Sequence, residues 1–351
     1  MTPGGSDAPP TRPKVFVVQP IMDVGRLALE EVADVEVHDS DRMIPRDVLL
    51  AAVRDSDYLW MLGDTPIDGE VLDAAPRLKG IATMALFPNV VDVDAATRRG
   101  LPVTVVPHVI TKTTCDLTCA LVLGLFWRLV EADRFVRDGR FHQEQSTSFL
   151  TRELSGKTVG MVGLGEIGAE IVGRLRAFEM DVVYTKRNRL SAERERELGV
   201  TWEPELDELL RRADVVVLMA TYNATTHRLI GAREFGLMKP SAYLVNTARG
   251  RIVDEPALID ALRDRTIAGA GLDVYWTEPP VGEPSPSREL FDLPNLILTP
   301  HIGSATVEAR EAMALAVVEN LRAMIAGERP PHVVNPEVYG EEALARSDRL
   351  G

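Results

Sequence analysis

Three side chains suited to proton transfer and anion binding each lie just after a short apolar run of the kind that forms a buried strand. They are Arg249, Glu278 and His301. Histidine exchanges a proton near neutral pH, and a neighbouring carboxylate favours its protonated form. Arginine offers a planar fork to a carboxylate or a carbonyl oxygen. One such residue in a loop is usually structural, but three at the carboxyl ends of strands in one sheet indicate a catalytic group.

A glycine-rich turn indicates the cofactor that this group would use. Thr158–Gly168 reads T-V-G-M-V-G-L-G-E-I-G, and apolar residues at helical spacing follow it. Strand, G-x-G-x-x-G and helix is the context of a dinucleotide-binding turn. Gly163 allows the sharp turn, Gly165 leaves room for a pyrophosphate, and Gly168 lets the helix lie close to the strand. The pyrophosphate then lies at the positive end of the helix.

The position that reads the cofactor ribose carries Thr185 followed by Lys186, Arg187 and Arg189. An NAD site usually has Asp or Glu there, about 20 residues beyond the glycines. A carboxylate would repel a 2′-phosphate, whereas threonine and cations would bind it. The alternative is a solvated basic loop. We predict NADP as the cofactor, with NAD possible.

Length, charge and hydropathy bound the function classes. The chain has 351 residues, enough for two domains with separate cores. Its net charge of −14 argues against nucleic-acid binding, because phosphate contacts need clustered Lys and Arg. It contains no apolar run long enough to span a bilayer, so we expect no membrane partner.

Two cysteines and the N-terminal segment indicate the compartment. Cys115 and Cys119 lie one helical turn apart in an apolar segment, which favours buried free thiols over a disulfide or a metal site. Residues 1–13 are rich in Pro and Gly and lack the apolar stretch of a signal peptide. We expect a disordered tail, a cytoplasmic protein and no bound metal.

Short apolar runs alternate with helical patterns along the chain, which indicates parallel, doubly wound sheets. In the first part the predicted strands are Val15–Val18, Val35–Val37, Tyr58–Leu62, Leu78–Ala82 and Val103–Val106, and the helices lie near Arg26–Ala33, Arg46–Arg54, Gly69–Ala75 and Asp92–Arg99. Beyond the glycine turn the predicted strands are Asp181–Tyr184, Val215–Met219, Ala242–Asn246, Ala268–Asp273 and Leu296–Thr299, and the helices lie near Ala192–Leu198, Glu205–Arg212 and Glu255–Asp264.

The last long amphipathic segment, Thr306–Ala326, is predicted to be a helix that packs back on the first part of the chain. We therefore expect an α/β protein with two doubly wound domains. A Rossmann dinucleotide-binding domain, residues 108–302, is inserted into a flavodoxin-like substrate-binding domain, residues 1–107 and 303–351. The two crossings would act as a hinge beside a cofactor cleft.

Residues Thr113 to Val136 are predicted to form one long helix, apolar around much of its circumference. Such a helix must be buried. It either forms an interdomain core or lies in a homodimer interface, and the sequence leaves both open. The polar stretch Phe141 to Thr151 is predicted to be a surface loop.

Four stretches carry a resemblance to a known family. They read L-S-G-K-T-V-G-M-V-G-L-G-E-I-G, N-T-A-R-G-R-I-V-D-E-P-A-L, A-G-A-G-L-D-V-Y-W-T-E-P and T-P-H-I-G-S-A-T. From about Val15 to Ala326 the sequence resembles the D-isomer-specific 2-hydroxyacid dehydrogenases, which include glyoxylate/hydroxypyruvate reductases and phosphoglycerate, formate and phosphite dehydrogenases. The resemblance implies the two-domain arrangement and a homodimer built through Thr113–Val136.

The resemblance also implies roles for the polar residues. Arg249 would hold the substrate carboxylate and polarise its carbonyl, His301 would be the acid/base, and Glu278 would orient His301 and raise its pKa. Asp273 would contact the nicotinamide end of the cofactor. Further predicted cofactor-binding residues are Gly163, Gly165, Glu166, Ile167, Gly168, Thr185, Lys186, Arg187, Ala220, Thr221 and Thr247.

The sequence departs from the family in the substrate loop, which reads T-M-A-L-F-P-N where relatives carry glycines. Pro88 removes one backbone donor, so the substrate-binding donors are predicted at Ala85 and Leu86. Met84, Leu86 and Phe87 would make the pocket more apolar and favour a branched or aromatic substrate. Alternatively, these side chains pack inward, or close the pocket around the smallest substrates. The loop has no lysine, which argues against phosphite oxidation.

We therefore predict an NADPH-preferring reductase that converts a 2-oxo acid to a D-2-hydroxy acid. An alternative is NAD-dependent oxidation of a related 2-hydroxy acid or oxyanion. A rival from another class is a nucleotide-sensing, corepressor-like scaffold, which can retain the same three residues. The acidic charge argues against that scaffold, and a turnover assay separates it from an enzyme.

Overall fold

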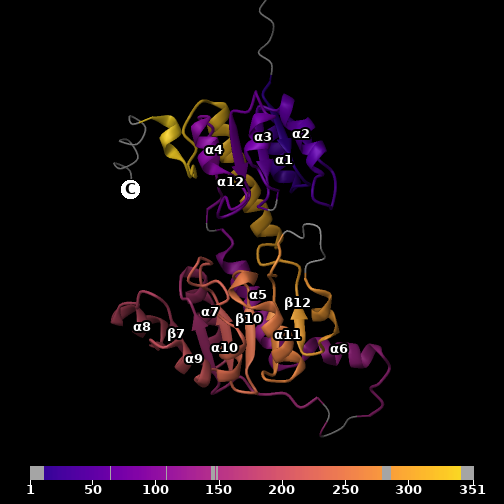
Figure 1. The fold of residues 1–351 in the computed structure, drawn as a ribbon, viewed down its shortest axis with the longest axis vertical. Helices are drawn as coiled ribbons and strands as arrows, with labels where there is room; N and C mark the ends of the chain where they lie inside the picture. Colours follow the sequence, from indigo (N-terminus) through magenta and orange to yellow (C-terminus); the bar gives the residue numbers. More distant parts are fainter. Residues whose placement is uncertain are drawn as a thin grey trace, which may run out of the picture. The chain divides into compact units, whose positions relative to one another are not determined.

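The computed structural model describes residues 12–63, 65–107, 109–143, 147, 149–278 and 286–340. The chain divides into two compact units: unit 1 is formed by Met1–Val109 and Val307–Gly351, and unit 2 by Ile110–Thr306. Each is an α/β structure built on one parallel sheet, which confirms the predicted fold class (Figure 1). The assignment of residues 1–107 and 303–351 to the substrate and of 108–302 to the dinucleotide stays a prediction.

The sheet of unit 1 has the strand order β2-β1-β3-β4-β5, and every pair is parallel. This is the flavodoxin-like order. β3 and β4 are buried along their whole length, as expected for central strands covered on both faces. The strands are β1 (Lys14–Val17), β2 (Asp34–Val37), β3 (Tyr58–Met61), β4 (Gly80–Thr83) and β5 (Val103–Thr104).

Unit 1 is completed by the C-terminal helix α12 (Val307–Ile325), which packs on α1 and β4. The Tyr58 hydroxyl donates to the Met324 carbonyl oxygen at 3.1 Å, and the Asn320 amide donates to the Val105 carbonyl oxygen at 3.0 Å. The prediction that the last long helix packs back on the first part of the chain is confirmed. The remaining helices are α1 (Asp23–Glu30), α2 (Arg46–Ala52), α3 (Gly69–Asp73), α4 (Val93–Arg98) and the 3-10 turns η1 (Val53–Asp55) and η4 (Pro336–Tyr339).

The predicted N-terminal tail lies mostly outside the described residues, but its last two residues are ordered against unit 1. The Arg12 guanidinium donates to the Ala33 carbonyl oxygen at 2.8 Å and pairs with Asp34 at 3.1 Å. The predicted disordered tail, residues 1–13, therefore wrongly includes residues 12 and 13. These two contacts hold Arg12 in place, although the Pro- and Gly-rich composition around it predicted a disordered segment.

The sheet of unit 2 has the order β12-β11-β10-β9-β6-β7-β8, all parallel, which is the Rossmann arrangement with one added strand. Alternate side chains of β9 serve two cores: Val215 and Val217 face one, and Val216 and Leu218 face the other. The strands are β6 (Thr158–Val162), β7 (Asp181–Thr185), β8 (Val200–Trp202), β9 (Val215–Leu218), β10 (Tyr243–Asn246), β11 (Gly269–Leu272) and β12 (Leu296–Leu298).

Helices cover both faces of this sheet (Figure 1). The sequence-based prediction missed β8 and α10, because each is short and carries only a weak periodic signal. The helices are α5 (Thr111–Phe126), α6 (Leu129–Arg137), α7 (Glu166–Arg176), α8 (Ala192–Leu198), α9 (Leu206–Arg212), α10 (Ala232–Leu237), α11 (Glu255–Arg263) and the 3-10 turns η2 (Gly250–Ile252) and η3 (Arg288–Asp292).

The single helix predicted over Thr113–Val136 is wrong. The chain breaks at Arg128, which takes the left-handed φ of 49°, and α5 and α6 meet at a bend of 61°. α5 is buried against β10, β11, β12 and α7, so it is a core helix of unit 2. Among the described helices none is long and apolar enough by itself to cross a membrane; only this bent pair reaches that length and composition together.

Both cysteines lie inside α5, where they are free and buried, as predicted. The segment that follows α6 was predicted to be a surface loop from Phe141 to Thr151. Its described residues form no helix or strand, and Phe141 and Leu150 are exposed. Residues 144–146 and 148 of that loop lie outside the described ranges.

Candidate active site

The predicted catalytic and cofactor-binding residues of unit 2 all follow the carboxyl ends of its strands. The glycine turn follows β6, Thr185 ends β7, and Ala220 and Thr221 follow β9. Thr247 and Arg249 follow β10. Asp273 and Glu278 follow β11, and His301 follows β12. Because all strands are parallel, these residues lie along one edge of the sheet, where ligands bind in doubly wound folds.

The glycine turn has the geometry that a dinucleotide requires. Gly163 has a φ of +90°, and a Cβ there would lie 2.7 Å from the Ala220 nitrogen, so the turn packs directly on the end of β9. A Cβ on Gly165 would meet nothing within 4 Å, which leaves open space beside the helix start. At Gly168 a Cβ would lie 3.0 Å from Leu164 Cδ1, so this glycine serves close helix packing. Glu166 and Ile167 form the first turn of α7. This chain therefore fits a dinucleotide at the β6–β9 switch point.

The cations after β7 have different environments. Lys186 Nζ donates to the Leu164 carbonyl oxygen at 2.8 Å, which places its charge beside the glycine turn. Arg187 is exposed to solvent. Arg189 instead forms a bidentate pair with Glu195, at 2.8 and 2.9 Å. Thr185 Oγ1 makes a 3.5 Å contact with the Pro204 carbonyl oxygen. Lys186 and Arg187 are thus the cations available to a ribose phosphate, whereas Arg189 is held by Glu195.

Asp273 anchors the loop that carries His301. Its Oδ1 accepts hydrogen bonds from Thr299 Oγ1 at 2.6 Å and from the Ile302 N–H at 2.8 Å. Its Oδ2 accepts from the Gly303 N–H at 2.8 Å. The residue is 1% exposed, so these bonds replace the water that its charge has lost. Its predicted contact with the nicotinamide stays a prediction.

His301 takes a left-handed conformation, with φ of 51°, between two anchored neighbours. This region is unfavourable for residues other than glycine and persists only where the surroundings enforce it. Besides the bonds to Asp273, the Gly303 carbonyl oxygen accepts from Thr114 Oγ1 of α5 at 2.9 Å. The loop is thus fixed from the sheet and from α5, and the strained backbone aims the histidine.

His301 and Glu278 form an ion pair. His301 Nδ1 lies 3.0 Å from Glu278 Oε2, and the other oxygen of Glu278 accepts from the Tyr275 N–H at 2.7 Å. The hydrogen bond to Glu278 raises the pKa of His301, and burial opposes this rise. The histidine side chain is 53% exposed and the glutamate 24%. The imidazole can therefore meet a substrate while its partner is shielded.

Arg249 is the third member of the group. Its backbone carbonyl accepts from the Asn246 amide at 2.9 Å, and its Nη1 donates to the Ala248 carbonyl oxygen at 2.6 Å. Burial lowers the pKa of Arg249 and the charge of Glu278 opposes that effect, while the charge of Arg249 lowers the pKa of His301. The Glu278 carboxylate thus acts to raise the pKa of both Arg249 and His301.

Two further residues that the sequence did not point to, Tyr275 and Thr118, also support this edge of the sheet. The buried Tyr275 donates from its hydroxyl to the Thr299 carbonyl oxygen at 2.7 Å, which joins the Glu278 turn to the His301 loop. Thr118 of α5 pairs with Thr247 through their hydroxyl groups at 2.8 Å. Thr247 is thus held from α5, and its predicted cofactor contact stays untested. The position of Tyr275 directly after the G-L-D-V stretch was the one available signal.

The predicted substrate-binding residues Ala85 and Leu86 lie in unit 1, directly after β4 and Met84. Met84 is 4% exposed and packs into unit 1. Leu86 is half-buried and Phe87 is 50% exposed. Of the three apolar side chains of the substrate loop, Leu86 and Phe87 are thus the more accessible.

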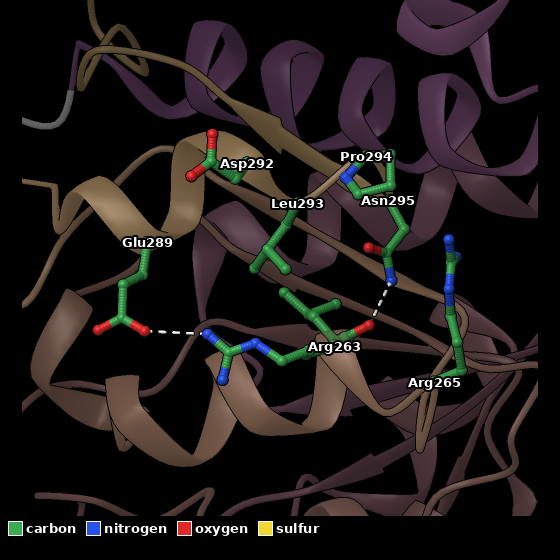
Figure 2. Close-up of a pocket in the computed structure, with 8 residues that line it drawn as sticks. Arg263, Arg265, Glu289, Asp292, Leu293, Pro294 and Asn295 are labelled. Atoms are coloured by element: carbon green, nitrogen blue, oxygen red, sulfur yellow. Dashed lines mark hydrogen bonds and ion pairs between the residues drawn. The ribbon is translucent and has the colours of Figure 1, made fainter.

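A depression of about 440 Å³ in unit 2 lies away from the catalytic group (Figure 2). Its lining includes Arg265, which precedes β11, and Asn295, which precedes β12, so it lies at the amino ends of these strands. Arg263 in this depression pairs with Glu289 at 2.9 Å. Within the described ranges, no cluster of His, Cys, Asp and Glu is arranged to hold a metal ion.

Residues 119–303, more than half of the chain, match the family model described as D-isomer specific 2-hydroxyacid dehydrogenase, NAD binding domain. The chain belongs to the D-isomer-specific 2-hydroxyacid dehydrogenase family. The dehydrogenase is 46% identical over 331 residues to a glyoxylate reductase of Thermococcus gammatolerans, with 93% of this chain and 97% of the relative covered. A glyoxylate reductase of Pyrococcus furiosus is also 46% identical, with 93% and 96% covered.

Solved structures agree with this membership. A protein of Thermus thermophilus aligns with a TM-score of 0.84 at 39% identity, covering 92% of this chain and 99% of that one. An NADPH-dependent glyoxylate/hydroxypyruvate reductase of Sinorhizobium meliloti, in complex with NADP and malonate, aligns with a TM-score of 0.76 at 32% identity, covering 92% and 97%. The dehydrogenase is an NAD(P)-dependent oxidoreductase acting on 2-hydroxy acids or the corresponding 2-oxo acids.

Within the glycine turn, Gly163 is expected to serve folding and Gly165 is expected to serve cofactor binding. Gly163→Ala should lower the free energy of unfolding by about 2 kcal/mol, because it forces a left-handed alanine against backbone. Gly165→Ala should change that free energy by less than about 1 kcal/mol, since the new Cβ meets open space. It should instead weaken NADPH binding. Urea unfolding and a fluorescence titration with NADPH measure the two effects; equal destabilisation by both variants would contradict the assignment.

Glu278→Gln should shift the pH profile of reduction. If His301 is the proton donor in reduction, kcat/KM falls as pH rises through the pKa of His301. Loss of the carboxylate lowers this pKa, and the fall should begin at a lower pH. The measurement is kcat/KM for 2-oxo acid reduction at pH values on both sides of the ordinary histidine pKa. Glu289→Gln, which removes an exposed partner of Arg263 (Figure 2), is the matched control and should leave the profile unchanged.

Proposed function

We propose that this dehydrogenase is an NADPH-preferring reductase that converts a small 2-oxo acid to a D-2-hydroxy acid, with Arg249, Glu278 and His301 as its catalytic set. The observation that carries the proposal is the 3.0 Å pair between His301 Nδ1 and Glu278 Oε2 at the edge of a dinucleotide-binding sheet. A histidine held in its protonated form by a carboxylate is a proton donor poised for carbonyl reduction.

Each member of the set has one task. A nicotinamide cofactor held at the glycine turn would supply the hydride that the carbonyl carbon accepts. His301 uses Nδ1 for Glu278, so its Nε2 is the atom that gives a proton to the carbonyl oxygen. Arg249 offers its guanidinium to the substrate carboxylate and to the charge that develops on that oxygen. The Glu278 carboxylate, 3.0 Å from Nδ1, stabilises the imidazolium before transfer. Solvent then reprotonates the half-exposed His301.

A turnover assay tests this proposal. The wild-type protein should oxidise NADPH when supplied with glyoxylate or hydroxypyruvate, and His301→Ala should lower kcat by about 10²–10⁴-fold with NADPH affinity nearly unchanged. His38→Ala, in unit 1, is the control. Near-wild-type kcat for His301→Ala at neutral pH would remove His301 as the proton donor. A complete lack of turnover with all 2-oxo acids would favour a nucleotide-binding scaffold.

The preference for NADPH is supported by Thr185 in place of an acidic residue and by the position of Lys186 beside the glycine turn. The Sinorhizobium meliloti relative is NADPH-dependent by name, at 32% identity. Arg187, exposed at the end of β7, completes a cationic site for a 2′-phosphate.

Arg187→Gln should therefore raise KM for NADPH by roughly tenfold, the weight of one charged hydrogen bond, and leave KM for NADH unchanged. Arg189→Gln is the matched control: its guanidinium is held by Glu195, so the ratio of the two KM values should stay near that of the wild type. A higher wild-type kcat/KM with NADH than with NADPH would refute the cofactor assignment.

The substrate is proposed to be small because three relatives at 46% identity are glyoxylate reductases. This favours the second possibility for the substrate loop, in which Leu86 and Phe87 close the pocket, over a preference for bulky acids. We expect a higher kcat/KM for glyoxylate and hydroxypyruvate than for 2-oxoisocaproate and phenylpyruvate. Phe87→Ala should narrow that gap.

We also propose that the protein is a homodimer that pairs around the α5–α6 corner. Four large apolar side chains at this corner, along α6 and just after it are exposed: Trp127 by 57%, Leu129 by 62%, Val136 by 58% and Phe141 by 61%. Contiguous exposed apolar side chains mark interaction surfaces. Since α5 itself is buried in unit 2, the surface belongs to the corner and α6 rather than to the whole segment Thr113–Val136.

The double variant Leu129→Asp/Val136→Asp should shift the protein from dimer to monomer in sedimentation-velocity runs. Leu27→Asp, which alters an equally exposed leucine on α1, is the control and should leave the dimer intact. A wild-type protein that sediments as a monomer would refute the dimer without bearing on catalysis.

A further inference from the structure

The turn Tyr275–Glu278 connects β11 to the carboxylate that pairs with His301. We propose that Trp276 is a positioning residue, which clamps this turn to the loop carrying Arg249 and thereby holds Glu278 at its distance from His301. The inference rests on the proposed roles of Arg249, Glu278 and His301. The residues that hold Trp276 come from two other loops on the same edge of the unit 2 sheet.

The backbone of Trp276 lies against residues that follow Arg249. Arg251 of η2 donates from Nε to the Trp276 carbonyl oxygen at 3.0 Å. Burial raises the pKa of the Glu255 carboxylate at the start of α11, and the nearby Trp276 N–H opposes that rise. Because the Trp276 carbonyl is held by a side chain from another loop, the peptide between Trp276 and Thr277 is fixed in orientation.

Gly250 lets the two loops approach this closely. A Cβ on Gly250 would overlap the carbonyl group of Tyr275 and lie 2.7 Å from the Trp276 nitrogen. No other residue fits at this position without moving the Tyr275–Glu278 turn. The glycine directly after Arg249 therefore has a packing role, distinct from the conformational role of Gly163.

The indole ring is held from a third loop, which lies between β9 and α10. The Arg228 guanidinium lies over the ring at 5.0 Å, and the His227 ring lies 5.6 Å from it. Arg228 is itself joined to the Arg249 loop, because its N–H donates to the Arg251 carbonyl oxygen at 2.9 Å. A cation over an indole face is attractive, so the ring and the backbone of Trp276 are fixed to the same neighbours.

The clamp acts on Glu278 through a short path. Tyr275 donates its N–H to Glu278 Oε1 and its hydroxyl to the Thr299 carbonyl oxygen. Trp276 lies between the Tyr275 N–H and Glu278. If Trp276 shifts, the backbone between this donor and Glu278 changes shape, and the carboxylate oxygen that faces His301 Nδ1 moves with it. Trp276 thus couples the Arg249 loop to the Glu278 turn, which Tyr275 joins to the His301 loop.

The experiment compares Arg251→Met and Trp276→Leu with the wild type and with Arg176→Met. Arg176 is a matched control, since it is exposed and donates to the Leu198 carbonyl oxygen at 3.0 Å elsewhere in unit 2. The pKa of His301 is measured by NMR in the cofactor-free protein, with its signal assigned by loss in His301→Gln. The pH dependence of kcat/KM is measured in parallel. Arg251 is exposed, so its variant remains informative if Trp276→Leu fails to fold.

Both test variants should lower the pKa of His301, move the fall of kcat/KM to lower pH and reduce kcat by about fivefold, the weight of one hydrogen bond, with KM for NADPH unchanged. In a Glu278→Gln background, Arg251→Met should cause no further change. A His301 pKa equal to that of Arg176→Met, or an additive effect in that background, would overturn the positioning role. A wild-type protein without turnover would instead contradict the proposed function and leave the NMR result to decide the clamp.

Discussion

The buried carboxylate of Asp273 is the interaction on which the site depends. It accepts three hydrogen bonds from Thr299, Ile302 and Gly303, the residues on either side of His301. A charge that is 1% exposed needs such partners, and the donors in turn need a fixed acceptor. These bonds fix the backbone on both sides of His301, and the left-handed φ of His301 is imposed by its neighbours.

The parallel sheet of unit 2 explains why these groups meet at all. Residues far apart in sequence, from Gly163 to His301, follow strands whose carboxyl ends lie at one edge. The sheet sets the approximate positions of these residues, and contacts between the loops set the final placement of their side chains. Two glycines allow this: Gly163 packs the cofactor turn on β9, and Gly250 packs the Arg249 loop on the Glu278 turn. Unit 1, built on its own flavodoxin-like sheet, carries the loop with Leu86 and Phe87.

Local sequence failed where the structure depends on contacts between distant residues. Thr113–Val136 is apolar enough for one helix, yet a left-handed Arg128 turns the chain, and its guanidinium pairs with Glu131 at 2.6 Å. Met84 has an apolar side chain that could line a pocket, but it packs into unit 1. Arg189 looks like a phosphate ligand in sequence and is instead paired with Glu195. In each case the residue type indicated what the side chain could do, but the sequence did not show which residue it contacts in the fold.

The sequence by itself determined the fold class, the order of most strands and helices, the glycine turn and the candidates Arg249, Glu278 and His301. These features follow from local hydrophobic periodicity and from residue types at strand ends. Only the tertiary structure decided that Asp273 holds the His301 loop, that Tyr275 links it to Glu278, and that Trp276 joins three loops. Hydrogen bonds and close backbone contacts between loops depend on three-dimensional distance, and no periodicity along the chain encodes that distance.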